Sequence, residues 1–78
     1  MRLFPQPVTE ELNVFMEGMM EGDRNYNIYA VSGEEIRRGR LSTTGKLGYF
    51  RIPVSDLLQG VYLITIGGAE TASRFVKL

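Results

Sequence analysis

The stretch Asp56-Leu57-Leu58-Gln59-Gly60-Val61-Tyr62-Leu63-Ile64-Thr65-Ile66 decides the fold of this 78-residue chain. Its second half is β-branched and aromatic, which is typical of a strand. Leu57, Gly60 and Tyr62 follow the spacing L-x-x-G-x-Y of a tyrosine corner, where a glycine permits a tight entry and the tyrosine hydroxyl bonds to upstream backbone. The stretch predicts a strand of a Greek-key β-sandwich in which alternate residues from Tyr62 to Ile66 face inward.

Short segments of alternating apolar and polar residues fill the rest of the chain, with turn signals roughly every 8–12 residues. No helix-length segment separates them, which argues against alternating strands and helices. The fold class predicted is all-β, an immunoglobulin-like antiparallel β-sandwich of about seven short strands in one domain over residues 1–78. The strands expected are Leu3–Val8, Glu11–Met16, Asn25–Ala30, Glu34–Leu41, Leu47–Ile52, Val61–Ile66 and Ala72–Leu78.

Turn and loop residues divide these segments. Ser32-Gly33 predicts a tight hairpin turn, since glycine accepts a positive φ at little cost. Ile36 is the apolar anchor expected for the strand that follows, and Ser42–Lys46 is expected to be a polar loop. Pro5 and Pro7 restrict the first strand to the edge of a sheet, because proline lacks the N–H that a central strand needs.

The segment over residues 11–22 also carries a helical pattern. Thr9 could serve as its N-cap, whereas Gly18 would weaken such a helix by about 1 kcal/mol. Val14 and Phe15 favour a strand. The pattern alone leaves helix and strand open. The apolar residues at helical spacing are Leu12, Phe15, Met16, Met19 and Met20.

The composition excludes several classes of function. Nine basic and nine acidic residues give a net charge of zero, so no long-range field attracts nucleic acid. The chain has no Cys and no His, which removes disulfides, thiolate metal sites and the commonest general base. No run approaches the ~20 apolar residues of a membrane span, and the start lacks the apolar region of a signal peptide. We expect no enzymatic activity, cofactor, metal or membrane insertion.

Two further groups of side chains have simple structural explanations, and a third is a candidate contact site. The arginines within 37–40 lie beside two glutamates without interleaved aromatic residues, so we expect a solvated strand face and no nucleic-acid site. Asp56 is expected to cap the turn that follows it. Phe15 and Tyr29 fall on the nominal outer face and are candidates for a contact patch.

Four blocks of sequence follow one another along nearly the whole chain. Pro5–Val14 reads P-Q-P-V-T-E-E-L-N-V, Tyr26–Ile36 ends in S-G-E-E-I, Ile52–Ile66 contains the corner, and Ser73–Lys77 reads S-R-F-V-K. In order and spacing, these blocks resemble the type A C-terminal sorting domains of the type IX (Por) secretion system of Bacteroidetes. The departures are Gln6, where that family has Asn between the prolines, a longer Met-rich segment after the first block, and one residue after the final lysine.

The resemblance implies a strand over 11–16, a loop over 17–24, and a function. Such a domain is the C-terminal part of a larger secreted protein, which it directs through the secretion system. The implied partners are the type IX outer-membrane translocon and its sortase-like surface complex, which removes the domain and joins the cargo to anionic lipopolysaccharide. Some members keep the domain and serve the machinery itself. The implied location is the periplasm in transit, then the outer membrane, the cell surface or the medium.

A domain that serves many cargoes needs an accessible handle, and the terminal strand is the candidate. As an edge strand it would offer free backbone groups for strand addition, with Arg74 and Lys77 adding charge contacts. An equal alternative is that Phe75 and Val76 only seal the core. The candidate sorting residues are Gly60, Tyr62, Arg74, Phe75, Val76, Lys77 and Leu78.

A second class of function stays open at this point. The chain could be an accessory β-sandwich that serves a secreted protein as a spacer or a glycan-binding domain. A sorting domain must lie at the C-terminus of its natural polypeptide, whereas a spacer need not. A glycan-binding domain would display a cluster of exposed aromatic residues. Open strand edges and zero net charge are also compatible with a homodimer.

Overall fold

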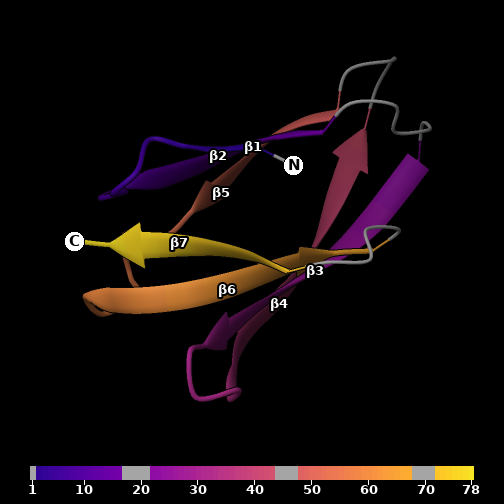
Figure 1. The fold of residues 1–78 in the computed structure, drawn as a ribbon. Coiled ribbons are helices and arrows are strands. Elements are labelled where there is room, and N and C mark those ends of the chain that lie inside the picture. The colour runs from indigo at the N-terminus through magenta and orange to yellow at the C-terminus, as the bar shows by residue number, and fades with distance from the viewer. Residues whose placement is uncertain (1, 17–21, 44–47, 68–71) are drawn as a thin grey trace.

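The computed structural model describes residues 2–16, 22–43, 48–67 and 72–78 (Figure 1). Within these ranges every regular element is a strand, which confirms the all-β prediction. The strands are β1 (Arg2–Phe4), β2 (Glu11–Met16), β3 (Gly22–Ala30), β4 (Glu35–Thr43), β5 (Gly48–Pro53), β6 (Gly60–Ile66) and β7 (Ser73–Lys77).

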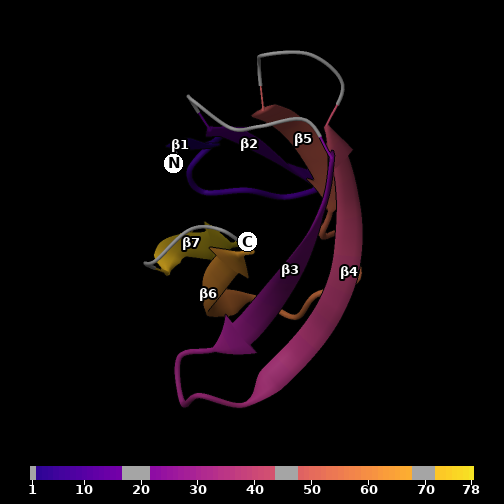
Figure 2. The ribbon, with the colours of Figure 1, turned by 90° about the vertical axis from the view of Figure 1, so that its right-hand side faces the viewer.

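The strands form two antiparallel sheets. β1, β2 and β5 make the smaller sheet in that order, and β4, β3, β6 and β7 make the larger one. Figure 2 shows the sheets as separate layers, with the long β3–β4 pair curving along one side toward the smaller sheet. This is the two-layer sandwich in which each amphipathic sheet buries one face, as predicted.

Apolar side chains from both sheets fill the space between them. The inward set predicted for β6 is buried, and the alternate residues of β2 face the same core. Full burial of each such side chain contributes about 1.5–3 kcal/mol, so this set holds the sheets together. The core consists of Val8, Leu12, Val14, Tyr26, Ile28, Leu41, Phe50, Ile52, Val54, Leu57, Tyr62, Ile64, Ile66 and Phe75.

The choice between helix and strand is settled for the described part of the segment 11–22. Glu11–Met16 is a strand that pairs with β1 on one side and β5 on the other. Leu12 and Val14 point into the core, whereas a helix would turn them to different sides. The stripe residues Met19 and Met20 lie outside the described residues. The expected loop over 17–24 is wrong at its end, because β3 begins at Gly22.

The fourth strand differs from the prediction in its apolar anchor. Ile36 is 42% exposed, and Leu41 instead supplies the core contact of β4. The cause is a register shift: Ile28 pairs with Arg37 while the next residue, Tyr29, pairs with Glu35. Ile36 is therefore the extra residue of a β-bulge, which periodicity along one strand does not reveal.

The hairpin around Gly33 and the end of β4 give one confirmation and one correction. Gly33 has a φ of 98°, and its N–H donates to the Ala30 carbonyl over 2.8 Å, so the predicted turn is confirmed. Ser42 and Thr43, expected in a loop, belong to β4 because the start of β3 supplies their backbone partners. The rest of that expected loop, residues 44–46, lies outside the described residues.

The first strand is shorter than predicted. β1 ends at Phe4 and lies at the edge of the smaller sheet. The chain then leaves the sheet through two prolines, which have no N–H to continue the ladder, and the Phe4–Pro5 and Gln6–Pro7 peptide bonds are cis. Val8 reaches the other sheet, where it forms a parallel bridge with Lys77 of β7.

Candidate functional site

The tyrosine corner forms as predicted. The Tyr62 hydroxyl donates a 2.6 Å hydrogen bond to the Leu58 carbonyl, while its ring is buried in the core. Leu57 is also buried, and its N–H donates to the Val54 carbonyl to close the preceding turn. Gly60 does not lie in the left-handed region, and a Cβ there would have only an ordinary 3.9 Å contact with Tyr62. The tight entry expected at Gly60 therefore does not depend on a glycine there.

The corner is joined to the terminal strand by aromatic packing. Tyr62 pairs with Phe75 across β6 and β7, and their rings stack with centroids 5.5 Å apart and planes at 22°. Phe75 is fully buried. The other candidate sorting residues follow in the same hairpin, with Gly60 opposite Lys77 and Val61 opposite Val76. The structure thus brings all of the candidate sorting residues together on β6, β7 and Leu78.

The terminal strand presents only part of this set to solvent. Arg74 and Leu78 are exposed and Val76 is half-buried. Lys77 is 6% exposed, and its Nζ donates to the Leu78 carbonyl over 2.6 Å. The expectation that Lys77 offers a charge contact at the surface is therefore wrong. Phe75 seals the core, as the structural alternative predicted.

The outer edge of β7 is covered. β7 is the last strand of its sheet, as expected, yet its edge carries hydrogen bonds from the segment after β1. The Val8 N–H donates to the Val76 carbonyl over 2.8 Å, and the Leu78 N–H donates to the Val8 carbonyl over 2.9 Å. The prediction of free backbone groups along this edge is wrong from residue 74 to residue 78.

Gln6 completes this cover with its side chain. Its Nε2 donates to the Arg74 carbonyl over 3.1 Å, and its Oε1 accepts from the Val76 N–H over 3.2 Å. We call the segment Gln6–Val8 with these four hydrogen bonds the clasp. Sequence reasoning missed it, although Gln6 between two prolines and the apolar Val8 were its visible signals.

An ion pair fastens the opposite edge of the larger sheet. The Arg37 guanidinium donates to the Asp56 carboxylate and to the Pro53 carbonyl. The hydrogen bond from Arg37 lowers the pKa of Asp56, and the same bond raises the pKa of Arg37. Arg37 therefore does not lie on the solvated face expected for the arginines of 37–40. The carboxylate of Asp56 joins β4 to the turn before β6.

The outer face of β3 and β4 carries a second polar network. Glu35 accepts from Arg38 over 2.8 Å and from Asn27 over 2.6 Å. These two hydrogen bonds, that from Arg38 first, lower the pKa of Glu35. Arg38 remains mostly exposed, as predicted for a solvated strand face.

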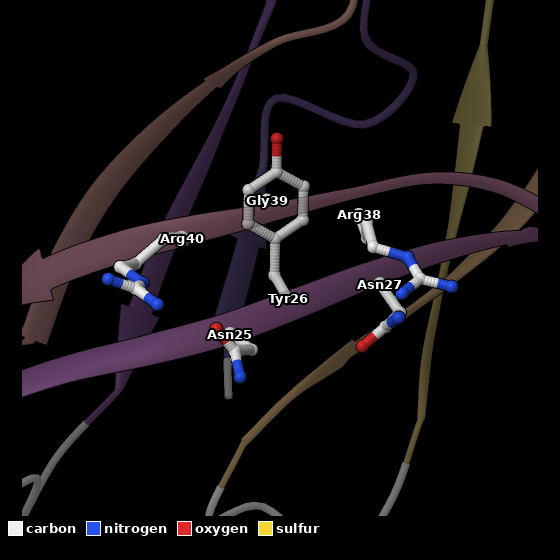
Figure 3. Close-up of a pocket in the computed structure, with 6 residues that line it drawn as sticks. All are labelled: Asn25, Tyr26, Asn27, Arg38, Gly39 and Arg40. Atoms are coloured by element: carbon white, nitrogen blue, oxygen red, sulfur yellow. The ribbon is translucent and has the colours of Figure 1, made fainter.

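Two shallow hollows lie on the strands of the described residues. One of about 450 Å³ lies on β3 and β4, where the Tyr26 ring covers Gly39 between the polar side chains shown in Figure 3. The other, of about 380 Å³, lies on the smaller sheet and is lined by Arg2, Phe4, Phe15 and Tyr49. Phe15 and Tyr29 belong to different sheets, so the single contact patch expected from them does not form.

The described ranges hold neither a cluster of metal ligands nor a membrane-spanning helix. No three His, Cys, Asp or Glu side chains within them gather as metal ligands would. No helix in the same ranges has the length and hydropathy needed to cross a membrane.

The fold defines a small β-sandwich module whose last two strands, β6 and β7, form an antiparallel hairpin. The chain belongs to a family of such modules: the family model described as "Secretion system C-terminal sorting domain" matches residues 2–78. Comparison with curated proteins gave no match, and neither did comparison with solved structures. The resemblance drawn from the four sequence blocks is thus confirmed.

Membership of this family gives the function in outline. The domain is a C-terminal sorting signal for type IX secretion, which implies interaction with that secretion system and export to the cell surface or the medium. The family is one of sorting signals and not of catalysts. The accessory alternative, a spacer or glycan-binding sandwich, is not favoured by this match.

Proposed function

We propose that residues 1–78 form a single sorting domain that follows a larger cargo, crosses the periplasm with it, and is recognised by the type IX outer-membrane translocon. The observation that carries the proposal is the family match over residues 2–78 together with a terminal hairpin that holds every candidate sorting residue. The sortase-like surface complex then acts on the domain. The domain itself performs no catalysis.

The candidate residues divide into two roles by burial. Tyr62, Phe75 and Lys77 are buried, and the stacked rings of Tyr62 and Phe75 hold β7 against β6. Arg74 and Leu78 are exposed and are the side chains that the translocon contacts. A cation and an apolar residue four positions apart suit a partner surface that pairs an acidic group with an apolar pocket.

We propose that the exported form does not dimerise through the edges of two β7 strands. A homodimer through the edges of two β7 strands would have to displace the clasp in both copies, at the cost of its hydrogen bonds. Covering an edge strand with another segment is a common way to prevent such pairing.

A reporter fusion tests the proposal. Residues 1–78 are joined to the C-terminus of a periplasmic reporter in a host with a type IX system, and surface delivery is measured by protease accessibility on whole cells. We expect delivery of the wild-type fusion and periplasmic retention of the double variant Arg74→Ala/Leu78→Ala. The matched control is Arg51→Ala, an exposed arginine on the smaller sheet.

Two results would contradict the proposal. Retention of the wild-type fusion in the periplasm would favour the accessory role. Normal delivery of the double variant would show that the translocon does not depend on the Arg74 and Leu78 side chains. The double variant must show the wild-type circular dichroism spectrum, so that retention is not the result of unfolding.

A further inference from the structure

The hydrogen bonds on the outer edge of β7 are those of a parallel β-ladder. In such a ladder one residue bonds to the two residues that flank its partner on the neighbouring strand. Val8 does this opposite Lys77, since it donates to Val76 and accepts from Leu78. The edge of β7 therefore accepts a parallel strand, and the chain itself supplies one paired residue of it.

The next place in the ladder is filled by a side chain. A strand residue opposite Phe75 would donate to the Arg74 carbonyl and accept from the Val76 N–H. The Gln6 carboxamide makes both of these bonds, with Nε2 as donor and Oε1 as acceptor. Its carboxamide thus takes the place of the backbone N–H and C=O of the residue that an added strand would put there.

We propose that the outer edge of β7 is a strand-docking site that the clasp fills in the free domain. Its partner is an extended peptide segment of the secretion machinery, which displaces Gln6–Val8 and pairs with β7 in parallel. This inference rests on the proposed function and gives the form in which the terminal strand is recognised. Strand addition of this kind takes affinity from main-chain hydrogen bonds and specificity from side-chain pockets.

The clasp is suited to replacement. Gln6 is exposed, and its two hydrogen bonds are long and made by a side chain that must be ordered to form them. A main-chain residue at the same place makes both bonds from its backbone and has no side-chain rotamer to fix for them. The incoming strand therefore exchanges an imperfect ladder for a complete one.

Val8 defines the side chain that the partner must carry. Val8 is fully buried and packs in the core, so its removal opens a pocket of valine size beside β7. The docking peptide needs an apolar, preferably β-branched residue at that position, because an unfilled pocket or a buried charge there is destabilising. The partner is thus an extended peptide with one apolar anchor.

A peptide copy of the clasp tests the proposal on the whole 78-residue chain. The probe is a fluorescent peptide with the sequence of residues 3–10, and its control carries Asp in place of Val8. We expect Gln6→Ala to bind the probe on the order of tenfold more tightly than wild type, because its own segment has lost two of the bonds that the probe must replace. The matched control is Gln59→Ala, an exposed glutamine that makes none of the clasp bonds.

The place of binding is read from amide resonances. We expect the probe to shift the N–H signals of Val76 and Leu78, whose partners change, in wild type and in Gln6→Ala. Equal affinity of the two proteins for the probe, equal binding of the Asp-containing peptide, or shifts confined to β4 would each overturn the proposal. Gln6→Glu supports the test if Gln6→Ala does not fold, because Glu keeps the acceptor for Val76 and loses only the donor to Arg74.

The reporter fusion separates this inference from the proposed function. If the wild-type fusion reaches the surface while Gln6→Ala leaves probe binding unchanged, strand docking is wrong and the sorting function stands. If the wild-type fusion stays in the periplasm, the proposed sorting function is wrong, whether or not the probe peptide binds to the domain.

Discussion

Arg37 and Asp56 form an ion pair that ties the edge strand β4 to the turn before β6. The Arg37 side chain is 20% exposed and that of Asp56 is 72% exposed, so water screens the pair from one side only. Arg37 also donates to the Pro53 carbonyl at the end of β5. One guanidinium therefore connects both sheets at this edge of the sandwich.

The ion pair predicts how stability depends on pH. Because Arg37 lowers the pKa of Asp56 in the folded state, the unfolded state binds more protons between the folded pKa and the unfolded value of about 3.9. The contribution is complete above the unfolded pKa and is lost as the pH falls through the folded pKa. We expect urea unfolding to show wild type more stable than Asp56→Asn at neutral pH, with the gap closing in acid. A gap that stays constant down to pH 2 would contradict the assignment.

The tyrosine corner predicts that removing the Tyr62 hydroxyl lowers the free energy of unfolding by a modest amount. Tyr62→Phe removes the hydrogen bond that the buried Tyr62 side chain donates to the Leu58 carbonyl, so we expect a loss of about 1–1.5 kcal/mol in the free energy of unfolding. Tyr49→Phe is the control, because the Tyr49 hydroxyl bonds to Asn13 on an exposed face. Chemical denaturation of both variants should show the smaller change for Tyr49→Phe; an equal change would show that the corner contributes nothing special.

Phe75 predicts a loss of export that results from unfolding. Phe75→Ala empties a fully buried site and should cost about 3–5 kcal/mol, much of the roughly 4–12 kcal/mol expected for a domain of this size. We expect a low melting temperature and failed delivery of the reporter. Phe4→Ala, at an aromatic residue that is 41% exposed, should retain both. A Phe75→Ala variant that melts normally but is not delivered would give Phe75 a direct role in recognition.

Replacement by alanine is expected to affect stability differently at Gly39 and at Gly60. A Cβ at Gly39 would lie 2.4 Å from Cε1 of Tyr26, whose ring is buried, so Gly39→Ala should cost about 1–3 kcal/mol through displacement of that ring. A Cβ at Gly60 would meet Tyr62 at an ordinary 3.9 Å, so Gly60→Ala should be close to neutral. Thermal denaturation of the two variants measures the difference, and a neutral Gly39→Ala would show that the Tyr26 ring moves freely.

The sequence predicted the features that depend on neighbours along the chain. The inward faces of β2 and β6, the turn at Gly33 and the corner at Tyr62 all follow from local spacing, and each is present. Ile36 was misplaced because a bulge is a relation between two strands. A strand read alone does not show which of its residues lacks a partner.

The clasp was beyond sequence reasoning for the same reason. Gln6 bonds to residues 68 and 70 positions further along the chain, and no periodicity links such distant positions. The terminal strand could be predicted as an edge from its place after β6. That its edge is occupied depends on where the two prolines direct the chain after β1.

The hydrogen bonds that join Val8 to Val76 and Leu78 set a lower limit on the length of any portable tail made from this domain. A tag cut down to β6 and β7 would carry the terminal residues but would lack the valine that fills their side of the core. A useful tag must therefore start upstream of Gln6. A linker to the passenger should be attached before Arg2, so that the segment Gln6–Val8 keeps its hydrogen bonds to β7 and Leu78.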